Sequence, residues 1–142
     1  MSSGNEPSQC FNAFLCAANR WECDAYIRSQ ASKGKMTVQE FYEATVKELK
    51  AWLPEFCTAK CVDRIQQLDG LDSGGSYGTD GGKIVSYEVT GKKARIETQG
   101  TNNYPDSERR HVYVLVLEDG QWKIDSKKEI SESGRERKVD LF

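Results

Sequence analysis

The sequence is poor in the residues that most catalytic and metal sites require. Its 142 residues include a single histidine, His111. A catalytic triad needs a base beside its nucleophile, and a structural zinc ion needs four ligands, usually Cys and His. We interpret His111, which precedes an apolar run, as a strand residue at the rim of a sheet. We therefore expect no catalytic residue, no metal site and no cofactor.

Long apolar runs and a charge surplus are also missing. The longest apolar runs, residues 13–18 and 112–117, have six residues each, whereas a membrane-spanning helix needs about 20. The first residues have neither the basic start nor the apolar segment of a secretion signal. The 20 basic and 22 acidic residues give a net charge of −2, without the basic surplus that phosphate binding needs. We expect a cytoplasmic protein that binds neither membranes nor nucleic acid.

All five cysteines lie in the first half of the chain: Cys10, Cys16, Cys23, Cys57 and Cys61. An odd number cannot form a closed disulfide framework. Cys57 and Cys61 are four residues apart, with no histidine near them in the sequence. Because a free cysteine behaves as a small hydrophobic residue, we interpret all five as reduced and mostly buried thiols.

Apolar residues recur every three or four positions in the N-terminal half, which predicts amphipathic helices. The first covers about residues 8–31. Thr37-Val38-Gln39-Glu40 has the form of a capping box and predicts the start of a second helix, which Pro54 ends. A third helix is expected from Pro54 to Leu68. Asp69-Gly70 would end it.

The period changes to two in the C-terminal half, which predicts strands. A hairpin is expected over residues 85–98, and residues 111–117 form a strand that is apolar on both faces. Asp119-Gly120 predicts a tight hairpin turn, and residues 122–125 form the last clear strand. The order predicts one segregated α+β domain over residues 1–142. Its parts are helices at about 9–68, a glycine-rich loop at 69–83, an antiparallel sheet at about 84–126 and a charged tail at 127–142.

The glycine-rich stretch "LDGLDSGGSYGTDGGK", residues 68–83, matches no phosphate or calcium motif. A Walker A loop needs Ser or Thr after its Gly-Lys pair, but Ile84 follows Gly82-Lys83, and Tyr77 occupies the position of the first glycine. An EF-hand needs side-chain oxygens at alternating positions. A loop that starts at Asp69 or at Asp72 does not have them. We interpret the stretch as a connection from helix to sheet that can contact a partner.

Two short patterns and the order of the elements resemble a known family. "DGQWKID", residues 119–125, and the preceding hairpin and apolar strand resemble the NTF2-like fold. "NRWECDAY", residues 19–26, is similar to the first helix of NTF2-fold immunity proteins, which accompany bacterial polymorphic toxins. The resemblance covers about residues 10–130. It implies a cone in which N-terminal helices pack on a curved antiparallel sheet and leave a cavity. The candidates to line that cavity are Trp21, Tyr87, Tyr113 and Trp122.

The resemblance implies a cytoplasmic protein that is not an enzyme and that neutralises a cognate toxin by steric occlusion. A homodimer through the open sheet is also consistent with this fold. If the toxin attacks nucleic acid, acidic loops can mimic phosphate, so exposed acids and tyrosines on the two long loops are the expected contacts. These are Asp69, Asp72, Tyr77, Asp80, Tyr104, Asp106 and Glu108.

The alternative is an NTF2-like enzyme of the SnoaL or ketosteroid-isomerase kind, or a small-ligand-binding protein that uses the sheet cavity. Fold alone does not decide between them. An enzyme would need a carboxylate or histidine inside the cone with a raised pKa. The positions that we expect to face inward are apolar or tyrosine, which counts against catalysis. They are Val85, Tyr87, Val89, Val112, Val114 and Val116.

Overall fold

The computed structural model describes residues 6–65, 83–100 and 110–139. Helices come first and strands second, as the sequence predicts. The helices are α1 (Pro7–Ala31), α2 (Val38–Trp52), the short 3-10 helix η1 (Leu53–Glu55) and α3 (Ala59–Asp63). The strands are β1 (Lys83–Thr90), β2 (Lys93–Gln99), β3 (Arg110–Glu118), β4 (Gln121–Ile130) and β5 (Glu136–Val139).

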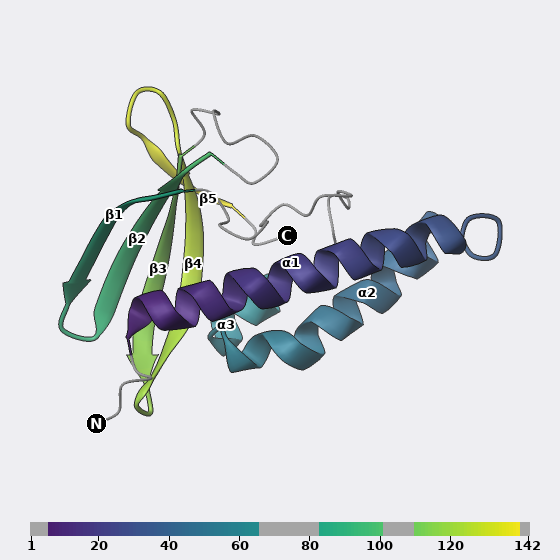
Figure 1. The fold of residues 1–142 in the computed structure, drawn as a ribbon, viewed down its shortest axis with the longest axis horizontal. Helices are drawn as coiled ribbons and strands as arrows, with labels where there is room; N and C mark the ends of the chain where they lie inside the picture. Colours follow the sequence, from purple (N-terminus) through teal and green to yellow (C-terminus); the bar gives the residue numbers. More distant parts are fainter. Residues whose placement is uncertain (1–5, 66–82, 101–109, 140–142) are drawn as a thin grey trace.

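The five strands form one antiparallel meander in the order β1-β2-β3-β4-β5. The helices lie against one face of this sheet, with α1 crossing it near one end (Figure 1). This arrangement confirms the predicted α+β class with N-terminal helices on an antiparallel sheet. The turn between β3 and β4 is also as predicted, since Asp119 and Gly120 both have positive φ, 51° and 78°, as a tight hairpin turn requires.

Helix α2 begins at the predicted capping box. The Thr37 side chain accepts the Glu40 backbone N–H at 3.0 Å, and the Glu40 carboxylate accepts the Thr37 N–H at 2.9 Å. These two bonds satisfy amide groups that have no partner within the helix. The capping box therefore fixes where the second helix starts.

The expected third helix, from Pro54 to Leu68, is wrong in its described part. Residues 56–58 leave the helical path and bond to β4, since the Thr58 N–H donates to the Ile124 carbonyl at 3.0 Å and the Ile124 N–H donates to the Phe56 carbonyl at 2.7 Å. Thr58 then caps the short α3 by accepting the Cys61 N–H at 3.2 Å. Pairing with the sheet thus divides the segment into η1 and α3.

The core lies between the first half of α1 and the middle of the sheet. Phe11, Phe14 and Leu15 are at most 1% exposed. The rings of Phe11 and Tyr113 have centroids 4.7 Å apart. Burying side chains of this size contributes roughly 1.5–3 kcal/mol each, so this contact between helix and sheet is the main apolar support of the fold.

Strand pairing corrects the expected orientation of β3. Tyr113 pairs with the buried Ile96 and faces the helices, whereas Val112 and Val114 pair with Glu97 and Arg95 on the opposite face. The prediction that Val112, Val114 and Val116 face inward is therefore wrong. Because β3 is apolar on both faces, its periodicity could not distinguish them.

The sequence predicts a charged tail from Lys127 onward, but part of this segment belongs to the sheet. β4 continues to Ile130, and β5 pairs with it at the edge of the sheet. Ion pairs link β5 to other strands: Glu136 contacts Lys128 on β4 and Arg95 on β2, and Arg137 contacts Glu129 on β4. Charged residues are typical of an edge strand because they oppose pairing with another chain.

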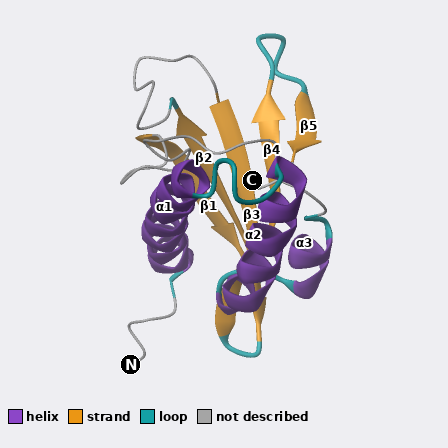
Figure 2. Cartoon of the chain, turned by 90° about the vertical axis from the view of Figure 1, so that its right-hand side faces the viewer, coloured by secondary structure: helices purple, strands orange, loops and turns teal. Residues whose placement is uncertain are grey.

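The second half of α1 and most of α2 form a helical hairpin that extends away from the sheet (Figures 1 and 2). Ala25 and Phe41 are buried in this hairpin, at 0% and 7% exposed. Among the described residues, neither belongs to the contiguous core cluster beneath the sheet. The far end of the hairpin is therefore separate from the main core.

Candidate functional site

The predicted toxin-contacting residues lie outside the described residues. Asp69, Asp72, Tyr77 and Asp80 fall in residues 66–82, and Tyr104, Asp106 and Glu108 fall in residues 101–109. They remain predictions.

Three of the four predicted cavity-lining aromatics lie in or against the core cluster, and the fourth lies on the edge strand β1. Tyr113 and Trp122 are 2% and 8% exposed and belong to the core cluster. Trp21 packs at the edge of that cluster, and its indole N–H donates to Glu48 at 3.2 Å. Tyr87 is 43% exposed on β1, where its hydroxyl accepts the Ser8 N–H at 3.4 Å. Packing therefore accounts for Tyr113 and Trp122.

A row of polar side chains crosses the helix-facing side of the sheet, next to the core residues Ile96 and Tyr113. Thr98 on β2, His111 on β3, Glu129 on β4 and Arg137 on β5 are successive pairing partners. The His111 Nε2 lies 3.9 Å from a Glu129 oxygen, and Arg137 donates to Glu129 at 3.1 Å. We call this set the polar row.

The polar row overturns the expectation that inward positions are apolar or tyrosine. His111 is 13% exposed at its side chain. The hydroxyl of Thr98 is buried and has no hydrogen-bond partner among the described residues, and Lys127 lies 5.6 Å from the centre of the Tyr113 ring. An imidazole near a carboxylate can hold or transfer a proton, and the cations can attract an anion.

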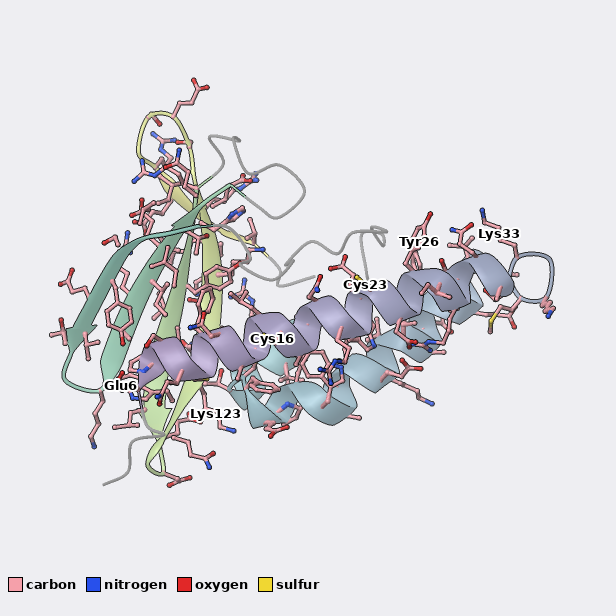
Figure 3. All side chains as sticks on the ribbon, viewed as in Figure 1. Glu6, Cys16, Cys23, Tyr26, Lys33 and Lys123 are labelled. Atoms are coloured by element: carbon pink, nitrogen blue, oxygen red, sulfur yellow. The ribbon has the colours of Figure 1, made fainter. Side chains whose placement is uncertain are left out.

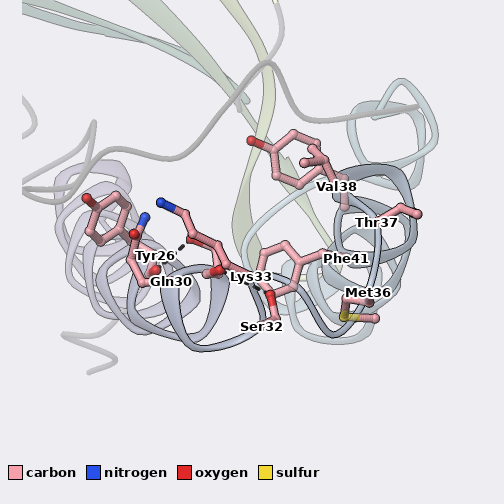
Figure 4. Close-up of a pocket in the computed structure, with 10 residues that line it drawn as sticks. Tyr26, Gln30, Ser32, Lys33, Met36, Thr37, Val38 and Phe41 are labelled. Atoms are coloured by element: carbon pink, nitrogen blue, oxygen red, sulfur yellow. Dashed lines mark hydrogen bonds between the residues drawn. The ribbon is translucent and has the colours of Figure 1, made fainter.

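A pocket of about 210 Å³ lies at the far end of the hairpin, where α1 ends and α2 begins. Figure 4 shows the Lys33 side chain between Tyr26 and Gln30 of α1 and Val38 and Phe41 of α2. We call this end of the hairpin, residues 26–42, the hairpin tip. Sequence reasoning missed it, because pattern alone does not reveal how far a hairpin extends from its sheet.

Exposed large apolar side chains occur on two parts of the described surface. Ile27, Met36 and Val38 are 66%, 41% and 71% exposed on the hairpin. The others lie on the edge strand β1: Ile84, Val85, Tyr87 and Val89. Clustered exposed apolar residues mark surfaces that bind other molecules.

The five cysteines are all free thiols. Cys57 and Cys61 are buried, Cys10 and Cys23 are partly buried, and Cys16 is exposed and lies along α1 (Figure 3). Contact with the Cys61 sulfur and burial both raise the pKa of the Cys57 thiol, so it stays protonated at neutral pH. In the described part of the chain, no three His, Cys, Asp or Glu side chains are placed to hold a metal ion.

None of the helices within residues 6–65 is long and apolar enough to cross a membrane.

N-terminal helices on one face of a five-stranded antiparallel meander define the class of this protein, which is an α+β protein of the NTF2-like type. The family model described as "NTF2 fold immunity protein" matches residues 6–138, and the chain belongs to this family. No curated protein and no solved structure matches the chain. The family match agrees with the resemblance carried by residues 19–26 and 119–125.

Proposed function

We propose that this protein is a cytoplasmic immunity protein that binds a cognate bacterial polymorphic toxin and neutralises it by steric occlusion. The observation that carries the proposal is the family match, which extends from α1 to β5. An immunity protein of this kind needs no catalytic residue. It acts through a surface that the toxin recognises.

The exposed apolar side chains support a role in protein binding. A stable complex buries about 1,200–2,000 Å² in total, and a few aromatic, apolar or charged residues contribute most of the binding energy. The hairpin and β1 both present exposed apolar residues that the core does not use. Either surface can supply such contacts.

The acids of the two long loops remain candidate contacts for a toxin that attacks nucleic acid. Such a toxin has a basic cleft, and carboxylates can occupy the positions of phosphates. Replacing Asp69, Asp72, Asp80, Asp106 and Glu108 together by Asn or Gln tests this idea. Unchanged affinity for the toxin would reject it.

The function is tested by expressing the toxin gene next to this one, alone and together with this protein. We expect growth arrest from the neighbour alone, normal growth with both, and a complex that co-purifies at a fixed ratio. Two results would contradict the proposal. The product of the neighbouring gene could be harmless when expressed alone, or it could remain toxic in the presence of this protein and form no complex with it.

The polar row favours a second candidate, a small-ligand-binding protein or an NTF2-like enzyme. His111 and Glu129 bring an imidazole and a carboxylate to the helix-facing side of the sheet. Native mass spectrometry of the purified protein and of its His111→Gln and Glu129→Gln variants tests this candidate. A bound small molecule that both variants lose would support it, whereas a wild-type protein with the mass of the bare chain would count against it.

A further inference from the structure

We propose that the hairpin tip docks on the toxin, and that its pocket receives an apolar side chain flanked by acidic residues of the toxin. This inference rests on the proposed function, because it names where the toxin binds. The recognised partner is thus a protein surface that combines a protruding apolar side chain with negative charge.

The pocket has the form of a site for one side chain. Phe41 is 7% exposed and lies at the base, whereas Met36 and Val38 are 41% and 71% exposed and also line it. The volume of about 210 Å³ accommodates one large apolar side chain. An exposed valine at the first residue of a helix has no role in the core, because the core cluster lies under the sheet.

The charge at the hairpin tip fits an acidic partner. Lys33 and Lys35 are exposed, and no described acidic side chain pairs with either. The nearest acid in sequence, Glu40, already accepts the Thr37 N–H in the capping box. The tip is therefore locally positive in a chain whose net charge is −2.

The same charge argues against a second copy of this chain as the occupant. Two tips facing each other would bring Lys33 and Lys35 of both copies together, and like charges in an interface reduce affinity. A toxin with a complementary acidic surface has no such cost. It also associates faster at low salt because opposite charges attract at a distance.

Local hydrogen bonds order both helix ends that meet at the hairpin tip. The Ser29 and Ser32 hydroxyls donate to the Tyr26 and Ser29 carbonyls at 2.7 and 3.1 Å. The capping box fixes the start of α2. A surface that is already ordered loses less conformational entropy on binding, so more of the contact energy contributes to affinity.

The test measures the affinity of the neighbouring toxin domain by calorimetry for two pairs of variants. Val38→Ser removes an exposed apolar side chain that lines the pocket, and its control Val89→Ser makes the same change at an exposed position on β1, outside the hairpin tip. Lys33→Glu/Lys35→Glu reverses the charge of the tip, and its control Lys47→Glu/Lys50→Glu makes the same change on the exposed side of α2. All four variants change exposed side chains only, and circular dichroism checks that each one folds.

We expect both tip variants to bind about tenfold more weakly or worse, with both controls within about twofold of the wild-type protein. The affinity of the wild-type protein should also fall more steeply with salt than that of Lys33→Glu/Lys35→Glu. In a ¹⁵N-labelled sample, the toxin should shift the amide signals of residues 26–42 before those of the strands.

The outcomes separate this inference from the proposed function. If the wild-type protein does not bind the toxin, the proposed function fails. If it binds and the tip variants match their controls, the function stands and the docking surface is elsewhere. The inference would also be overturned if the tip variants and their controls lost the same affinity for the toxin. Binding of the tip to vesicles of anionic phospholipid, but not to the toxin, would overturn it as well.

Discussion

Arg28 of α1 and Glu48 of α2 form a bidentate ion pair across the helical hairpin, with two N–O distances of 2.8 Å. Glu48 also accepts the indole N–H of Trp21 at 3.2 Å. The tryptophan of the "NRWECDAY" pattern therefore helps to join α1 to α2. Glu48 thus connects α2 to two side chains of α1, Trp21 and Arg28.

Replacing Glu48 with Gln should lower the free energy of unfolding by about 0.5–1 kcal/mol at pH 7, because both partners are about 40% exposed. Hydrogen bonds from Arg28 lower the pKa of Glu48 below its ordinary value of 4.5. A lowered folded-state pKa stabilises the protein above the unfolded-state pKa, and this contribution is lost as the pH falls through the folded-state pKa. The difference between wild type and variant should therefore shrink below about pH 4.5.

Urea unfolding at pH 7 and pH 3.5 measures this difference. Glu43→Gln, on the exposed side of the same helix, is the control and should change stability little at either pH. A stability difference between wild type and Glu48→Gln that is the same at pH 3.5 as at pH 7 would contradict the ion pair.

Replacing Thr37 with Ala should destabilise the protein by about 1 kcal/mol, because the first turn of α2 loses its side-chain cap. Thr37→Ser keeps the hydroxyl and should remain close to wild type. Thermal unfolding followed by circular dichroism tests both. Equal melting temperatures for Ala and Ser would show that the cap contributes nothing.

Replacing Leu115 with Ala should cost about 2–5 kcal/mol, because a fully buried side chain leaves a cavity in the core between α1 and the sheet. The control is Val89→Ala on β1, where the side chain is 45% exposed. It should change stability by no more than about 0.5 kcal/mol. Denaturant midpoints that rank the two variants in the opposite order would contradict the assigned core.

Thiol labelling should follow burial along the chain. At pH 8, Cys16 should react first because it is exposed. Burial raises the pKa of Cys10, and burial together with the Cys61 contact raises that of Cys57, so both have less reactive thiolate. Mass spectrometry after timed iodoacetamide treatment gives the order. Labelling of Cys57 in the folded protein as fast as that of Cys16 would contradict its burial.

Local chemistry made the start of α2 and the hairpin of β3 and β4 predictable from the sequence. A capping box at Thr37 and Glu40 and a turn at Asp119-Gly120 act within a few residues, so pattern alone identifies them. The prediction of one continuous third helix was wrong because β4, which is distant in the sequence, forms hydrogen bonds with residues 56–58. The sequence around residues 56–58 contains no pattern that indicates this contact.

The polar row was missed for two reasons: β3 is apolar on both faces, so its inward face was assigned wrongly, and the pairing of β3 with β4 is irregular. Counting outward from the Asp119-Gly120 turn pairs Leu115 with Ile124, but the register shifts by one residue beyond that pair, so that Val114 pairs with Ser126. This bulge sets His111 opposite Glu129 instead of Lys128. A single extra residue in a strand moves every later side chain to a new partner, and the sequence does not mark its position.

The separation of the hairpin tip from the core has a consequence for how related chains diversify. Residues at the joined ends of α1 and α2 can change in size and charge without disturbing the cluster under the sheet. Under the docking mode that we propose, recognition depends on the exposed residues of the hairpin tip and stability depends mainly on the core cluster. A transplant of the exposed residues of the hairpin tip between two such proteins, with Arg28, Thr37 and Phe41 retained, should exchange their partners while each keeps its own melting temperature.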